Sequence, residues 1–270
     1  MPTVKVNDIS IYYEIHGEGE PLILIMGLGG TLEWWFRQVP VFSQHYRVIP
    51  FDNRGSGRSD KPDIPYTMEM MAKDTVGLMD ALGIPSAHIF GISMGGMIAQ
   101  HVTLLYPQRV KTLVLGATTC GGSHSVSPDP ESMKVLFDLE QMQTLSPEDR
   151  FREMLPFIFS QEFIESSRSV MQELAVRMSQ HITPPHGYMR QAQAIMGHDT
   201  YDRLPEIKAP TLVIAAEEDK IVPVENSRII ASRIPGAELV VLERAGHGFN
   251  IELADEVNRA VLDFLRRHRT

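Results

Sequence analysis

A serine flanked by two glycines, Gly91-Ile-Ser93-Met-Gly95, is the part of this sequence whose residue types most clearly suggest chemistry. A Gly-x-Ser-x-Gly stretch presents a nucleophile when a buried strand runs into it and a helix runs out of it. The sharp turn leaves no room for side chains two residues either side of the serine. Here the apolar run SAHIFG leads into the motif, and the helix-like run MGGMIAQHVTLLY follows it. We therefore expect Ser93 to lie on a strained strand-to-helix turn.

A serine hydroxyl is a poor nucleophile without a base, and the base needs a carboxylate that orients it. Both residue types occur downstream of Ser93, each after an apolar run. The acids Glu217, Glu218 and Asp219 follow the run PTLVIAA, and His247, between two glycines, follows the run AELVVLE. Serine, then acid, then histidine is one of the chain orders in which such a triad occurs. The pattern by itself leaves three acids open for the orienting role.

Eight segments of the sequence have the hydrophobic pattern of strands. Two short segments alternate apolar and polar residues, as half-exposed antiparallel strands do, and six continuous apolar runs are typical of strands buried on both faces. The alternating segments are 4–6 and 9–15, and the continuous runs are 21–30, 46–51, 86–91, 110–116, 210–216 and 237–243. Helical patterns lie between most of the runs, at 67–82, 94–106, 224–233 and 250–267. This alternation predicts an α/β fold: a mostly parallel, eight-stranded twisted sheet with helices on both faces.

The alternation of strands and helices stops between residues 123 and 205, after the sixth predicted strand. Ser146-Pro147 followed by an acid at Asp149 is typical of a helix start. We predict a helical cap, residues 123–205, inserted into a core made of residues 1–122 and 206–270. The flexible side chains of methionines suit a roof over an apolar pocket. We expect most of the cap methionines to pack between helices and a minority to face the pocket: Met133, Met142, Met154, Met171, Met178, Met189 and Met196.

Composition narrows the classes of partner. The 270 residues carry a net charge of −9, which argues against nucleic acid or an anionic membrane as the main partner. The only cysteine, Cys120, leaves no disulfide or Cys-based metal site within one chain. Metal-ligand spacings and dinucleotide-binding glycine patterns are missing as well, so we expect no cofactor and no metal. The absence of a signal-peptide pattern predicts a cytoplasmic protein, and a homo-oligomer stays open.

With these elements in place, the sequence resembles the α/β-hydrolase superfamily along nearly its whole length. The motifs that carry the resemblance are FDNRGSGRSD (51–60), GISMGG (91–96), APTLVIAAEEDKIVP (209–223) and AGHGFNIE (245–252). Within the superfamily the chain is similar to the group that holds 3-oxoadipate enol-lactonases, cofactor-free haloperoxidase-type esterases and meta-cleavage C–C hydrolases. The resemblance implies that Ser93 is the nucleophile, His247 the general base and then acid, and Asp219 the orienting acid.

The resemblance also implies an oxyanion hole made of two backbone N–H groups, those of Leu28 and Met94. Many relatives have His-Gly in the early loop where this chain has Met26-Gly27. Because the donor is a backbone group, loss of that histidine need not remove the hole. Removal of one such donor lowers turnover by about 10²–10³-fold, so the assignment has consequences for activity.

The expected activity is that of a carboxylesterase-like serine hydrolase acting on a small to medium, largely apolar ester or lactone. Ser93 at the nucleophile position disfavours epoxide hydrolase and haloalkane dehalogenase chemistry, because relatives with those activities carry Asp there. A C–C hydrolase of meta-cleavage type remains an alternative. So does a non-catalytic ligand-binding protein, since a fold does not determine a function.

Structural roles are expected for several other polar residues. We expect Asp52 and Arg54 to hold their loop by an ion pair. We expect His198 and Asp199 to anchor the cap through hydrogen bonds in a loop. Cys120 lies beyond an apolar run without a base motif, and we expect it to pack in the interior.

Overall fold

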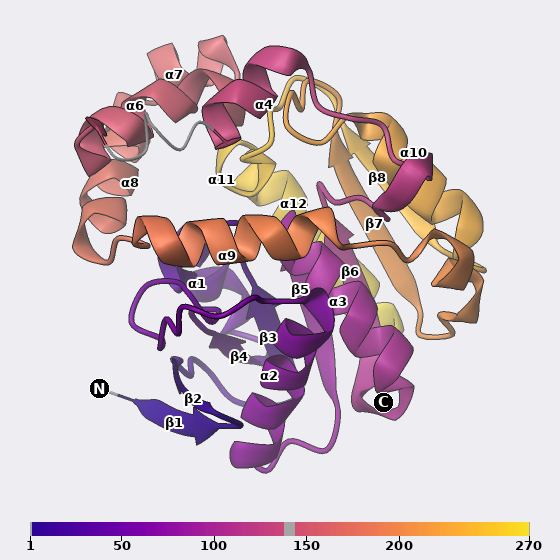
Figure 1. The fold of residues 1–270 in the computed structure, drawn as a ribbon. Coiled ribbons are helices and arrows are strands. Elements are labelled where there is room, and N and C mark those ends of the chain that lie inside the picture. The colour runs from indigo at the N-terminus through magenta and orange to yellow at the C-terminus, as the bar shows by residue number, and fades with distance from the viewer. Residues whose placement is uncertain (1, 138–143, 270) are drawn as a thin grey trace.

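A six-stranded parallel sheet lies at the centre of the computed structural model, which describes residues 2–137 and 144–269 (Figure 1). Its spatial order is β4-β3-β5-β6-β7-β8, and every neighbouring pair is parallel. The strands are β3 (Pro21–Ile25), β4 (Arg47–Pro50), β5 (Ala87–Ile92), β6 (Val110–Gly116), β7 (Thr211–Ala216) and β8 (Glu238–Leu242). The predicted α/β class is confirmed. The chain direction across the sheet switches between β3 and β5, and ligands of such sheets bind at the carboxyl ends beside a switch point.

The first two strands form a small sheet of their own. β1 (Thr3–Val6) and β2 (Ile9–Tyr12) pair with each other in antiparallel register. All eight predicted strands are therefore present, but six rather than eight form the central sheet. The reason is that the chain after β2 meets the region of β4 only at isolated bridges, Tyr13 with Phe51 and His16 with Val48, which do not form a continuous ladder.

Both faces of the central sheet are buried under helices, as predicted. Alternate residues of a strand point to opposite faces, so Ile23 of β3 joins one apolar cluster and Leu22 joins another. The helices that contribute to the first cluster include α2 (Met68–Ala81), α3 (Met94–Leu105) and α10 (Val224–Arg233), and those of the second include α1 (Val39–Phe42) and α12 (Ala254–Arg267) (Figure 1). The predicted helix 250–267 is divided into α11 (Phe249–Glu252) and α12, because Leu253 between them has a non-helical ψ of 46°.

The described residues between β6 and β7 form helices and no strand. These helices are α4 (Pro130–Phe137), α6 (Pro147–Ile158), α7 (Gln161–Ser166), α8 (Arg168–Gln180) and α9 (Pro185–Met196). We call them the cap helices, and we propose residues 123–205 as the limits of the unit they form. They lie over the carboxyl ends of the central strands, and α9 runs across the molecule between the other four cap helices and the sheet (Figure 1). The helix start predicted at Ser146 is present: Ser146 is the N-terminal capping residue of α6, and its Oγ accepts a hydrogen bond from Asp149 N at 3.1 Å.

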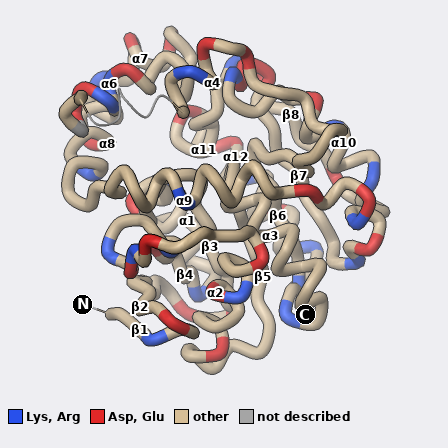
Figure 2. Tube along the Cα trace, viewed as in Figure 1, with Lys and Arg blue, Asp and Glu red and all other residues tan. Residues whose placement is uncertain are grey.

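Charged residues are dispersed along the trace, with Lys and Arg interspersed among Asp and Glu (Figure 2). Among the helices that the structure describes, none is long and apolar enough to cross a membrane.

Candidate active site

Ser93 lies on the turn from β5 to α3 with φ 57° and ψ −124°. Residues other than glycine rarely adopt a positive φ, and this conformation stores strain at functional positions. Two hydrogen bonds hold the turn in place. Ser93 N donates to Gly116 O at 2.9 Å, and Thr118 Oγ1 donates to Ser93 O at 2.8 Å. The neighbouring strand β6 and the residues after it therefore fix the strained serine.

The two glycines of the motif are required by close approach of the backbone. A Cβ atom at Gly91 would lie 2.2 Å from Gly95 O, and one at Gly95 would lie 2.0 Å from Ile25 O. Neither position can hold a side chain without displacing backbone atoms. The sequence prediction for this turn is thus matched in its geometry: a strand, a strained serine between two crowded glycines, and a helix.

Asp219 and His247 form a hydrogen-bonded pair after the last two strands. The distance between His247 Nδ1 and Asp219 Oδ2 is 2.7 Å, and only 1% of the Asp219 side chain is exposed. The carboxylate can only accept, so Nδ1 carries the proton and Nε2 is left as the acceptor. The second oxygen, Asp219 Oδ1, accepts from Ile221 N and Val222 N, each at 2.8 Å. The acid is therefore held in place from two directions.

The structure separates the three candidate acids. Glu217 and Glu218 have exposed side chains, and Glu217 Oε2 lies 3.4 Å from Arg228 Nη2. Asp219 is the buried member of the three and the one in contact with His247.

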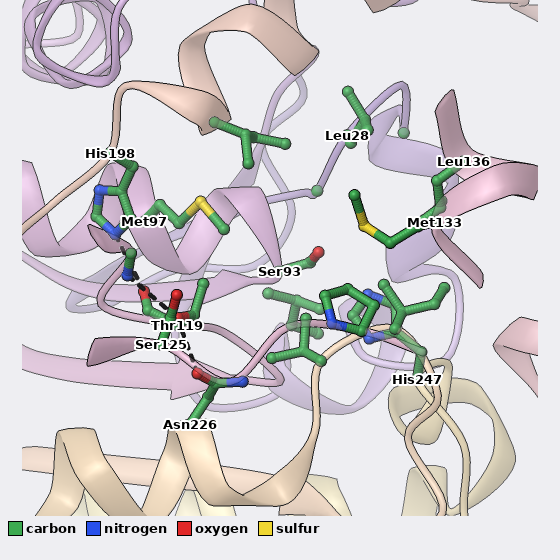
Figure 3. A pocket seen from close by; sticks show the side chains of 18 of the residues that line it. Leu28, Ser93, Met97, Thr119, Ser125, Met133, Leu136, His198, Asn226 and His247 are labelled. Atoms are coloured by element: carbon green, nitrogen blue, oxygen red, sulfur yellow. Dashed lines mark hydrogen bonds between the residues drawn. The ribbon is translucent and has the colours of Figure 1, made fainter. Parts of the chain in front are cut away.

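Ser93 and His247 line one cavity, of about 490 Å³, between the ends of the central strands and the cap helices (Figure 3). Within the described residues no hydrogen bond joins Ser93 Oγ to His247. Of the six cap methionines that are described, three line the cavity: Met133, Met154 and Met196. Met142 lies outside the described residues.

The loop after β3 passes close to the Ser93 hydroxyl. A Cβ atom at Gly27 would lie 3.3 Å from Ser93 Oγ, and both Gly27 and Leu28 line the cavity. Leu28 N makes no hydrogen bond within the described residues. Met94 is the first residue of α3, where a helix leaves its N–H groups without intrahelical partners. Met94 thus follows Ser93 directly, and Leu28 follows the glycine that lies against the Ser93 side chain.

Polar residues line the side of the cavity near β6, and the sequence offered no motif for two of them, Thr119 and Asn226. Thr119 Oγ1 donates to Asn226 Oδ1 at 3.1 Å (Figure 3). His198 Nε2 lies 3.0 Å from Thr119 O, and its Nδ1 lies 3.1 Å from His101 Nε2. Burial, with a smaller effect of His101, lowers the pKa of His198 to about 4. Asp199 also forms an isolated antiparallel β-bridge with Gly121. Together these contacts connect the loop at His198 and Asp199 to the core, as the sequence predicted.

The ion pair expected between Asp52 and Arg54 is wrong, although both residues hold their loop. Asp52 Oδ2 lies 3.0 Å from Arg58 Nε, and its Oδ1 accepts from Leu32 N at 2.8 Å. Arg54 instead forms a bidentate pair with Asp74 of α2. Cys120 is buried, as expected, and burial raises the pKa of its thiol. In the described part of the chain, no three His, Cys, Asp or Glu side chains are grouped as metal ligands.

Comparison with known proteins gives matches over nearly the whole chain. The model of a family described as alpha/beta hydrolase fold matches residues 20–253. The crystal structure of an enol-lactonase from Burkholderia xenovorans LB400 is 31% identical, covers 98% of this chain and 100% of its own, and has a TM-score of 0.87. The 2-hydroxy-6-oxo-6-phenylhexa-2,4-dienoate hydrolase of Comamonas testosteroni is 33% identical over 97% of this chain and 93% of its own length. A protein of Azorhizobium caulinodans assigned as the carbamate hydrolase RutD is 30% identical over 98% of both chains.

These matches span the sheet, the turn at Ser93 and the segments that carry Asp219 and His247. They agree with the resemblance seen in the sequence motifs and with the parallel sheet of the structure. The chain belongs to the α/β-hydrolase family.

Proposed function

We propose that this hydrolase cleaves small to medium, largely apolar carboxylic esters or lactones through an acyl-enzyme on Ser93. One observation carries the proposal. Ser93, whose backbone is strained, lines the same cavity as His247, and the buried Asp219 carboxylate lies 2.7 Å from His247 Nδ1. Nucleophile, base and orienting acid are the parts that acyl transfer needs.

The proposed reaction has two halves. Ser93 Oγ attacks the carbonyl carbon and gives its proton to His247 Nε2, and the oxyanion accepts hydrogen bonds from the N–H groups of Leu28 and Met94. His247 returns the proton to the leaving oxygen, and an acyl-enzyme remains. His247 then activates a water that releases the acid. The bond between Ser93 and His247 forms when substrate is bound, because catalytic hydrogen bonds often tighten only in the complex.

The lining of the cavity supports an uncharged, apolar substrate. Its volume of about 490 Å³ is that of a pocket for a small organic molecule. No Lys or Arg of the described residues lines it. The methionines of the cap helices can repack around acyl groups of different shape. Short and medium acyl chains therefore fit this pocket better than anionic or very long ones.

A panel of p-nitrophenyl esters, from acetate to decanoate, tests the proposal on the wild type and on Ser93→Ala. We expect the wild type to hydrolyse the esters from acetate through hexanoate faster than the longer ones. We expect Ser93→Ala to lose about 10⁴-fold or more in kcat. Ser232→Ala, which changes an exposed serine of α10, is the matched control and should keep wild-type rates. A fluorophosphonate should label the wild type once and leave Ser93→Ala unlabelled. Full activity of Ser93→Ala, or no ester or lactone turnover by the wild type, would contradict the proposal.

C–C bond hydrolysis is the second candidate, favoured by the relative from Comamonas testosteroni that is named a dienoate hydrolase. The same three residues can serve that reaction, so the panel should include a phenyl-substituted hydroxy-oxo-dienoate and an aryl carbamate. The dienoate carries a carboxylate, which the cavity lining does not attract, so we expect the best ester to have the higher kcat/KM. A dienoate that reacts faster than every ester would assign the protein to C–C hydrolysis instead.

A further inference from the structure

Two residues of the proposed cap segment, residues 123–205, bind the loop after β3 on both sides of one residue, Gly29. Gly29 N donates to Gln191 Oε1 at 2.8 Å, and Thr183 Oγ1 donates to Gly29 O at 2.8 Å. Both partners are distant in sequence, by 162 and 154 residues. The ring of Tyr188 packs against the same glycine, whose φ is +67°. The peptide groups before and after Gly29 are thus fixed by residues that come from another part of the chain.

Gln191 makes further bonds that tie this loop to a second one. The side chain is fully buried in α9, and its Nε2 donates to Arg54 O at 2.7 Å and to Ser56 Oγ at 2.8 Å. Its amide therefore uses its oxygen and both N–H groups. A buried amide is costly unless its hydrogen bonds are made, and a residue serving packing alone would be apolar. The polar side chain therefore indicates that Gln191 serves to hold the loop after β3 and the loop 51–60 in fixed positions.

From these contacts we propose that Gln191 and Thr183 are positioning residues for the oxyanion hole, an inference that rests on the proposed function. Leu28 is joined to Gly29 by the peptide whose N–H Gln191 binds. A bond from Gly30 N to Gly27 O at 3.1 Å closes the loop around them. Fixing the Gly29 peptides therefore restrains the backbone of the adjoining Leu28, which lines the same cavity as Ser93.

The contacts matter because a hydrogen-bond donor in an oxyanion hole must be in place before charge develops. A misplacement of about 1 Å in a catalytic arrangement can lower the rate by about 10²-fold. The cap segment thereby has a second role besides shaping the pocket: it completes the hole when Gln191 and Thr183 are bonded to Gly29.

Substitutions that remove these bonds test the inference with p-nitrophenyl butyrate. Thr183→Val keeps the shape of the side chain and removes the donor, and we expect kcat to fall by about 10-fold with KM little changed. Thr183→Ser restores the hydroxyl and should restore kcat. Gln191→Met should lower kcat by about 10²-fold. Gln193→Met is the matched control on α9, because Gln193 is exposed and bonds to Arg190 rather than to the loop.

A pair of inhibitors separates a change in the hole from a change in the pocket. A butyl trifluoromethyl ketone adds to the serine and places an oxyanion in the hole, whereas butyl methyl ketone of the same length binds without reacting. We expect Thr183→Val and Gln191→Met to lose affinity for the first in proportion to kcat and to keep their affinity for the second.

Three outcomes would overturn the inference. The first is an unchanged kcat in both Thr183→Val and Gln191→Met. The second is an equal loss of affinity for the two ketones in these variants, because an equal loss would indicate a defect of the whole pocket. Either result, with a wild type that cleaves the ester through Ser93, removes the positioning role and leaves the proposed function standing. The third is a wild type that neither cleaves the ester nor binds the trifluoromethyl ketone, which removes both.

Discussion

At the scale of single residues, Asp219 combines two contacts that constrain each other. Its Oδ1 accepts from Ile221 N and Val222 N in the loop after β7, and its Oδ2 accepts from His247 Nδ1. The backbone donors fix which oxygen faces the histidine. The carboxylate therefore holds the imidazole in the tautomer whose Nε2 accepts the Ser93 proton in the proposed reaction.

The Asp219→Asn variant should separate these contacts. Its oxygen will keep the two backbone N–H groups, so its amide nitrogen will face His247 Nδ1 and donate to it. The ring must then carry its proton on Nε2, where it cannot accept from Ser93. We expect kcat for p-nitrophenyl butyrate to fall by about 10³–10⁴-fold with an intact fold.

The matched control for that variant is Glu218→Gln, which makes the same chemical change on the exposed neighbouring acid. We expect its kcat to stay within about twofold of the wild type. Equal losses in Asp219→Asn and Glu218→Gln, or a fully active Asp219→Asn, would contradict the orienting role.

At the scale of elements, a buried ion pair joins helix α2 to the loop 51–60. Exposure of the side chains is 1% for Arg54 and 2% for Asp74, and a bond from Arg54 Nη2 to Asp74 Oδ1 measures 2.8 Å. A buried guanidinium left without its partner is strongly unfavourable. This loop also carries the carbonyl of Arg54 that Gln191 binds, so the pair supports the region beneath the candidate oxyanion hole.

Asp74→Ala should lower the free energy of unfolding by about 3–5 kcal/mol, because it leaves the buried charge of Arg54 with only the exposed carboxylate of Asp8 as a partner. The control is Asp80→Ala on the same helix, whose side chain is 61% exposed and pairs with Arg109. A surface pair contributes about 1 kcal/mol or less, so this variant should be nearly as stable as the wild type. Urea unfolding followed by circular dichroism measures both, and equal stabilities would contradict the assigned role of the pair.

The elements also show what local sequence pattern can and cannot predict. The strand β5, the helix α3 and the strained turn at Ser93 follow from an apolar run, a helical period and two glycines. Asp219 and His247 could be predicted to meet because the carboxyl ends of parallel strands share one edge of the sheet. The partner of Arg54 could not, since Asp74 becomes its neighbour only when α2 packs against the loop.

The contacts of Gln191 with the core could not be predicted from the sequence pattern. Gln191 lies 162 residues from Gly29 in sequence, and no periodicity relates the two. The pair Pro184-Pro185 does not tell from sequence alone whether a helix ends or begins there, since proline occurs at both places. The structure begins α9 at Pro185, because a first-turn N–H needs no intrahelical partner.

At the scale of the whole molecule, two buried histidines link folding to pH. His88 lies in β5 with its Nδ1 2.8 Å from Thr112 Oγ1, and His198 lies beside the cavity. Burial lowers the pKa of each to about 4. In the unfolded chain a histidine has a pKa of about 6.5. Between these values the unfolded chain binds protons that the folded protein does not, so stability is full above about pH 6.5 and is lost as the pH falls towards about 4.

We expect the free energy of unfolding to fall by about 1.4 kcal/mol per pH unit for each of the two histidines as the pH falls below about 6.5. Urea titrations between about pH 5 and pH 6.5 measure this slope before most carboxylates titrate. His88→Leu removes one titrating group, so its slope should be smaller by one proton even if its stability is lower at every pH. His45→Gln is the control: His45 is exposed in the folded protein and so lies in water in both states, and this variant should keep the wild-type slope. A slope unchanged by His88→Leu would show that acid lability comes from other groups.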